Sequence, residues 1–127
     1  MNHRKLYIIL IVAHASYILV TALWPLFDIE SFMQVTGPKT DIWLVKTVAV
    51  LLIPIAICLL SALFLETHPL PVILVGMTCA AGLAVIDFYY TSNETISRIY
   101  AWDGILELIF LAGWCYLLFK FRGKLIT

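Results

Sequence analysis

Four ionisable side chains lie within stretches of sequence that are otherwise apolar. Lys46 lies in TDIWLVKTVAVLLIP, residues 40–54, whereas Asp87, Asp103 and Glu107 lie in two later apolar stretches. A charge at the centre of a membrane helix costs roughly 2.5–3.5 kcal/mol on insertion scales, so such a group usually faces protein or water and has a partner. One ammonium group and three carboxylates could bind an ion, a lipid head group or a proton.

The depth of each residue along its helix predicts which of these charges meet. At a rise of about 1.5 Å per residue, Lys46 lies about 9 Å below the start of its helix and Glu107 lies roughly 10 Å below the start of another, entering from the same side. Asp103 lies one helical turn above Glu107 on the same face. We therefore predict an ion pair between Lys46 and Glu107. The predicted pocket contains five residues: Trp43, Lys46, Asp87, Asp103 and Glu107.

This predicted pair has two other interpretations. It could be a structural ion pair that fixes helix register, or Lys46 could extend its ammonium group to the membrane interface. Three carboxylates against one lysine also leave an excess of negative charge. At least one acid should therefore hold a proton or recruit a cation, water or Arg98.

His14 is the one histidine placed near the middle of an apolar stretch. We expect a neutral imidazole that is hydrogen-bonded to a neighbouring side chain. Haem ligation by two histidines is not favoured, because His3 and His68 lie at the membrane boundary. The three cysteines stand singly, which does not favour a disulfide redox enzyme. We predict no metal site and no cofactor.

The composition places all of these residues in a membrane protein. The 127 residues are 63% hydrophobic and 13% charged, with a mean hydropathy of +1.02, which is outside the range of soluble domains. A bilayer core about 30 Å thick requires roughly 20 apolar residues per helical span. We predict an all-α protein with one domain, a polytopic four-transmembrane-helix bundle. Its spans cover about residues 6–24, 42–65, 71–90 and 99–119.

The first span resembles a secretory leader, with the small-residue motif AHA at residues 13–15. We interpret it as a membrane helix, because the apolar run continues beyond that motif. Basic residues then set the topology. The side carrying both termini collects Arg4, Lys5, Lys120, Arg122 and Lys124, and the other side has Lys39, Lys46 and Arg98. We expect cytoplasmic N- and C-termini.

Two connecting segments carry local structural signals. In PLFDIESFMQVTG, residues 25–37, apolar side chains recur at helical spacing, which predicts a short interfacial helix that caps the outer end of the bundle. An irregular loop is the alternative. In ETHPLP, residues 66–71, two prolines end the second span and start the third. We therefore predict that these two spans are tight antiparallel neighbours.

The third span carries small residues at four-residue steps. Gly76, Ala80 and Ala84 form a stripe that leads to Asp87. Small side chains allow membrane helices to approach closely. We expect this stripe to bring the acidic residues of neighbouring helices together.

The segment VTGPKTDIWLVKTV, residues 35–48, with the later VIDFYY and WDGILEL, resembles small four-span bacterial integral membrane proteins that have no assigned activity. This resemblance implies a bacterial inner membrane and transfers no catalytic residue. Small multidrug exporters are similar in length and span number, but their essential glutamate lies in the first helix, where this chain has His14. Four-span sterol isomerase-like proteins are similar in architecture alone.

These features favour a binding protein or an accessory subunit over an enzyme. The pocket would hold a membrane lipid or a small hydrophobic molecule, or support contact with a homodimer partner or a larger membrane complex. The alternative is a small enzyme or a proton- or ion-coupled transporter, in which Glu107 or Asp87 accepts a proton and Lys46 tunes it. A purely structural scaffold is a further alternative. We expect no nucleic-acid partner.

Overall fold

The computed structural model describes residues 2–125, and within them the chain forms five α-helices and no strand. Four of these helices are long and apolar enough to cross a membrane, which confirms the predicted four-helix membrane bundle. They indicate an integral membrane protein. The helices are α1 (His3–Phe27), α2 (Ile29–Thr36), α3 (Ile42–Ser61), α4 (Pro69–Ser92) and α5 (Ile99–Leu125).

The helix ends follow local signals in the sequence. Asn2 caps α1, because its side chain accepts a hydrogen bond from the backbone N–H of Arg4. Pro69 occupies the first position of α4, where a proline leaves no additional backbone group unpaired. α1 begins earlier than the predicted span and α3 ends earlier, because a helix end is set by capping and turns as well as by hydropathy.

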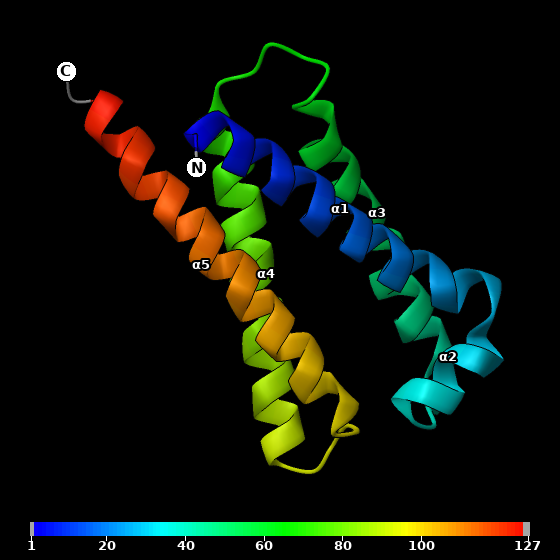
Figure 1. Cartoon of the computed structure of the whole chain (residues 1–127). Helices are drawn as coiled ribbons and strands as arrows, with labels where there is room; N and C mark the ends of the chain where they lie inside the picture. Colours follow the sequence, from blue (N-terminus) through cyan, green and yellow to red (C-terminus); the bar gives the residue numbers. More distant parts are fainter. Residues whose placement is uncertain (1, 126–127) are drawn as a thin grey trace.

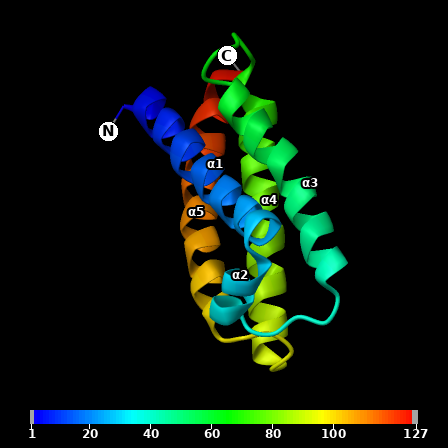
Figure 2. The same cartoon turned by 90° about the vertical axis from the view of Figure 1, so that its right-hand side faces the viewer.

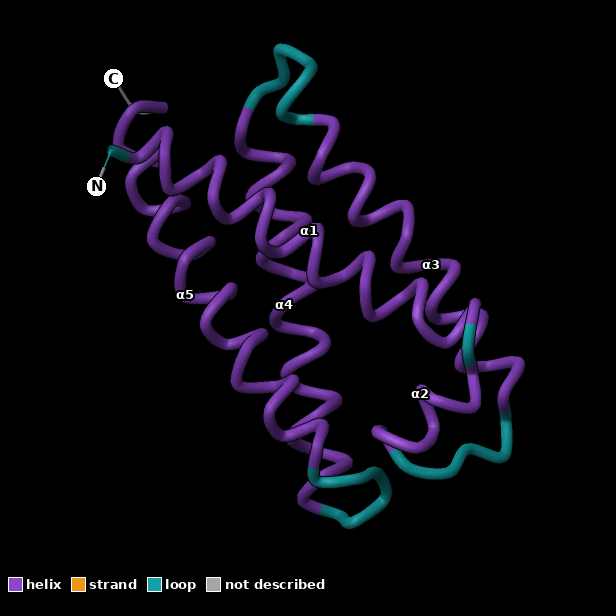
Figure 3. Tube along the Cα trace, turned by 45° about the vertical axis from the view of Figure 1, so that its right-hand side comes forward, coloured by secondary structure: helices purple, strands orange, loops and turns teal. Residues whose placement is uncertain are grey.

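The four long helices pack as two pairs, α1 with α3 and α4 with α5. Both termini lie at one end of the bundle, and the two pairs diverge toward the other end (Figures 1 and 3). α3 and α4 pack against each other far less than each packs against its own partner. The predicted tight pairing of these two spans is therefore wrong. Their proline-containing connection sets where the helices end, but not the angle at which they leave it.

The apolar core lies in the half of the bundle near the termini, where all four long helices contribute side chains. Gly76 of α4 lies so close to Trp114 of α5 that a Cβ atom at Gly76 would be 2.4 Å from the indole ring. Ala80 and Ala84 are also buried. The stripe of small residues therefore lies buried on α4, which packs most extensively against α5.

The segment after α1 is helical, so the predicted short helix is confirmed and the loop alternative is wrong. α2 lies at the wide end of the bundle, where it contacts α1 and α5 (Figure 2). Asp28 caps it, because its Oδ1 accepts a hydrogen bond from the Ser31 backbone N–H at 3.1 Å. The Trp24 indole N–H donates to Ser31 Oγ at 2.7 Å. These contacts fasten the start of α2 to the end of α1.

Candidate ligand-binding cavity

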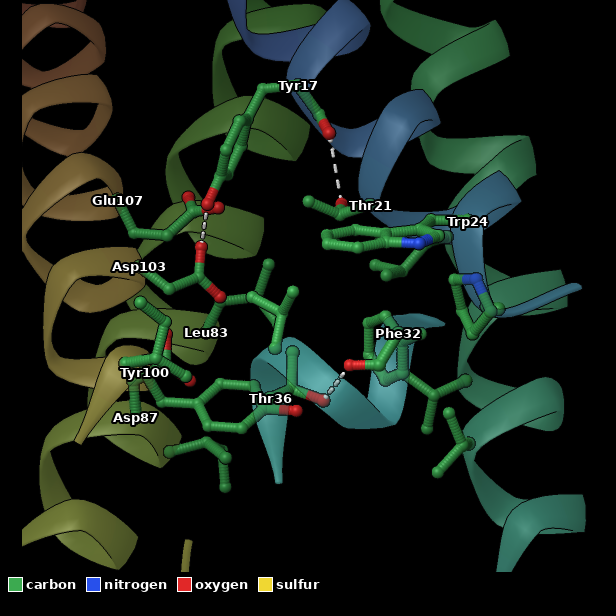
Figure 4. A pocket seen from close by; sticks show the side chains of 18 of the residues that line it. Tyr17, Thr21, Trp24, Phe32, Thr36, Leu83, Asp87, Tyr100, Asp103 and Glu107 are labelled. Carbon is green, nitrogen blue, oxygen red and sulfur yellow. Dashed lines mark hydrogen bonds between the residues drawn. The ribbon is translucent and has the colours of Figure 1, made fainter. Parts of the chain in front are cut away.

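A cavity of about 530 Å³ lies between the two diverging helix pairs and is lined by side chains from all five helices (Figure 4). Small-molecule sites in proteins typically measure about 300–1,000 Å³. Aliphatic and aromatic side chains form most of its wall. The aromatic residues are Tyr17 and Trp24 of α1, Phe32 of α2, and Tyr100 and Trp102 of α5.

The three predicted acidic residues meet at this cavity. Asp87 of α4 and Asp103 and Glu107 of α5 all line it (Figure 4). Glu107 is 1% exposed and Asp87 is 5% exposed, whereas Asp103 is half-buried. A Cβ atom at Gly104 would lie 3.3 Å from that of Asp87. The missing side chain at Gly104 therefore allows α4 to bring its acid to the two on α5.

α1 contributes a phenol to the acidic cluster. The Tyr17 hydroxyl donates a hydrogen bond to Asp103 Oδ1, as the dashed line in Figure 4 shows. Oδ2 of Asp87 is buried and accepts no hydrogen bond from the described residues while both aspartates are ionised. The Asp103 carboxyl lies close enough to share a hydrogen bond with Asp87 when one of the two holds a proton. An unpartnered buried carboxylate oxygen is costly, because the group has lost its hydration without replacement.

His14 of α1 links Glu107 to the apolar core. The Trp114 indole N–H donates to His14 Nδ1 at 3.0 Å, and His14 Nε2 lies 3.2 Å from Glu107 Oε2. Since an indole N–H can only donate, Nδ1 must be an acceptor and the imidazole proton must be on Nε2. His14 is therefore a neutral imidazole that donates to Glu107, as predicted. Phe110 stacks on its ring with a centroid separation of 4.4 Å.

The cluster contains three carboxylates and no charged basic partner among the described side chains. The one contact of salt-bridge type is between His14 and Glu107, and its imidazole is neutral. The ammonium group of Lys39 lies 5.1 Å from the centre of the ring of Tyr100, which lines the cavity. Its ammonium group donates instead to the backbone carbonyls of Thr36 and Gly37. Protons or an external cation must therefore offset the negative charge.

The predicted ion pair between Lys46 and Glu107 is wrong. Lys46 is exposed on α3 and lies in a shallow hollow with Thr47, Val50 and Leu51, away from the acids. Trp43 is 67% exposed and does not line the cavity. Depth along a helix does not predict the direction in which the Lys46 side chain points. α3 packs on α1, and it is α1 that supplies the partners of the α5 acids.

Tyr17 and Trp114 make polar contacts at the site, and the sequence reasoning assigned no role to either. A signal for both was available in the spacing of polar and aromatic residues. Tyr17 follows His14 by three residues, and Trp114 follows Glu107 by seven, so each pair shares a helix face. Two such faces, one on α1 and one on α5, would have indicated the contact that the structure shows.

This fold and cavity define a small integral membrane protein with an acidic cavity between two helix pairs. Comparison with protein-family models, with curated protein sequences and with solved structures finds no match. The function is therefore argued from the shape, lining and charge of the cavity.

Proposed function

We propose that the protein binds a small amphipathic molecule in this cavity. The apolar part of the ligand would lie among the aliphatic and aromatic side chains, and its polar end would lie at the carboxylates. The observation that carries the proposal is the combination of a cavity of about 530 Å³ with three acids along one wall. An apolar pocket with a few convergent polar groups is the usual form of a ligand site.

The lining also suggests the route by which the ligand enters. Several cavity residues are themselves exposed on the sides of the membrane helices, among them Leu44 and Val48 of α3, Ile86 of α4 and Leu106 of α5. The gap between the two helix pairs would thus open sideways to the lipid acyl chains. A molecule dissolved in the bilayer could move into the cavity without crossing the aqueous phase.

We also propose a bacterial inner membrane and cytoplasmic termini, which would place the cavity in the outer leaflet half. The support is the excess of basic residues at the terminal end, where Arg4, Lys5, Lys120 and Arg122 lie near the helix ends. The side chain of Lys124 is outside the described residues. Labelling of single cysteines at Glu66 and at Asn93 with an impermeant reagent in intact cells tests the orientation. Labelling at Glu66 alone would contradict it.

A bulky residue inside the cavity tests the proposed binding. Leu83 of α4 lines the cavity, whereas Leu74 of the same helix is exposed outside it. We expect the wild type and Leu74→Trp, isolated in a mild detergent, to retain a bound small molecule that native mass spectrometry detects. Leu83→Trp should lose it. Equal occupancy in both variants, or no bound molecule in any of the three proteins, would contradict the proposal.

A further inference from the structure

We infer that the polar end of the ligand is a primary ammonium group, whose N–H donors bind Asp87 and Asp103. This inference rests on the proposed function, because it names the chemical class of the molecule that occupies the same cavity. It follows from the charge of the cluster, from an unpartnered oxygen and from the nature of the remaining wall.

The negative charge of the acidic cluster favours a ligand with a positively charged head group. Asp87, Asp103 and Glu107 line the cavity together, and the indole of Trp114 keeps His14 neutral by occupying its Nδ1 as an acceptor. The ammonium group of Lys39 donates to two backbone carbonyls and forms no salt bridge with these acids. A phosphate or carboxylate head group would be repelled here, and a hydroxyl head group would leave the negative charge to be offset by protons alone.

The unpartnered Oδ2 of Asp87 favours a ligand head group that donates hydrogen bonds. Oδ2 of Asp87 is buried without a partner, on a side chain that is 5% exposed and lines the cavity. Tyr17 occupies Oδ1 of Asp103. Ionised carboxylates only accept hydrogen bonds, and a primary ammonium group supplies three donors. A quaternary ammonium group carries the same charge but has no N–H, so it would leave Asp87 Oδ2 unpartnered.

The remaining cavity wall is mainly apolar and favours a ligand with a hydrophobic body. Trp24 and Phe32 pack edge to face with ring centroids 5.6 Å apart, and both line the cavity with Tyr100. Aromatic faces accept alkyl chains and also attract nearby cations. Among the described residues, no group of three or more histidine, cysteine, aspartate or glutamate side chains is arranged to hold a metal ion. The cavity therefore matches an organic cation with a hydrophobic body.

Four probes of equal chain length test this inference on the full-length protein in phosphatidylcholine nanodiscs. They are hexylamine, hexyltrimethylammonium, hexanol and hexanoate, and isothermal titration calorimetry against empty nanodiscs measures each affinity at pH 7. We expect hexylamine to bind most tightly. Asp87→Asn should weaken hexylamine binding by about tenfold or more, the value of one charge-assisted hydrogen bond, and leave hexanol binding within about twofold.

Glu66→Gln serves as the matched control, because Glu66 is an exposed acid outside the cavity. Asp103→Asn is the second variant, and unchanged hexanol binding shows that either variant is folded. If hexanol binds as tightly as hexylamine, the ammonium assignment is overturned while the proposed function stands. If hexyltrimethylammonium equals hexylamine, the assignment of N–H donors is overturned. If the wild type binds none of the four probes, the inference and the proposed function both fail.

Discussion

The two halves of the bundle use the same four long helices in opposite ways. In the half near the termini, which we call the closed half, the helix pairs meet, and buried side chains such as Ile11, Leu59, Ile73 and Trp114 form one apolar core. In the other half, which we call the open half, the pairs diverge around a cavity that is bordered by acids. Near the termini Gly113 of α5 allows close approach between the pairs, because a Cβ atom there would lie 2.8 Å from the Leu10 side chain of α1.

The polar contacts lie at the boundary between these halves. His14 bonds to Trp114 in the closed half and to Glu107 at the edge of the open half. Tyr17 joins α1 to Asp103 one turn further along. These contacts connect the two helix pairs where apolar packing ends. We therefore expect the closed half to act as a base that orients the polar groups of the cavity.

The largest predicted effect comes from disturbing the closed half. Gly76→Ala places a Cβ atom against the Trp114 indole, and both residues are buried. Overpacking of this kind typically costs about 1–3 kcal/mol. We expect a clear fall in melting temperature in detergent. Gly82→Ala is the control, because nothing lies within 4 Å of its added Cβ atom and the change should be neutral or slightly stabilising.

The boundary contacts come next in size. We expect His14→Phe and Glu107→Leu each to destabilise the protein, because each leaves a buried polar partner unsatisfied at a cost of about 1–3 kcal/mol. The double variant should lose less unfolding free energy than the sum of the losses in the two single variants, with a coupling energy of about 0.5–3 kcal/mol. A matched cycle between Lys46→Met and Glu107→Leu should be additive. A coupling energy in that second cycle would contradict the structure, because it would indicate an ion pair between Lys46 and Glu107.

The sequence predicts the helices and their buried faces better than the contacts between helices at the cavity. Hydropathy located the four spans, and the four-residue spacing of Gly76, Ala80 and Ala84 marked a buried stripe. Both are properties of a single helix. The partners of Glu107 depend on which helices are neighbours and on how each is rotated, and neither depth nor charge determines these. Lys46 has the opposite charge, yet its side chain is exposed, and the neutral His14 is the partner of Glu107.

A smaller effect is expected at Lys46 itself. Lys46→Met removes a side chain that is exposed and has no salt bridge among the described residues. Surface substitutions of this type usually change stability by less than about 0.5 kcal/mol. We expect an unchanged melting temperature and unchanged hexylamine binding. A loss of about 3–5 kcal/mol, as for the breaking of a buried ion pair, would show that Lys46 faces the acids.

The smallest effect concerns the helix that covers the open half. The hydrogen bond from the Ser31 N–H keeps the pKa of Asp28 below its usual value of 3.8. A lowered pKa means that the folded state favours the carboxylate form of Asp28. The contribution of this cap to stability is therefore fully present above the usual pKa of the side chain. It is lost as the pH falls through the pKa of the folded state. In hydrogen–deuterium exchange, Asp28→Ala should expose the α2 amides at neutral pH. Asp28→Asn should protect them, because an amide oxygen can still cap the helix.

Global stability should hardly change in either Asp28 variant, because Asp28 is exposed and lies outside the core. A parallel change in the exchange of the α1 amides around Ile11 and His14 would contradict this separation. It would mean that the two halves unfold together and that the closed half does not act as an independent base for the cavity.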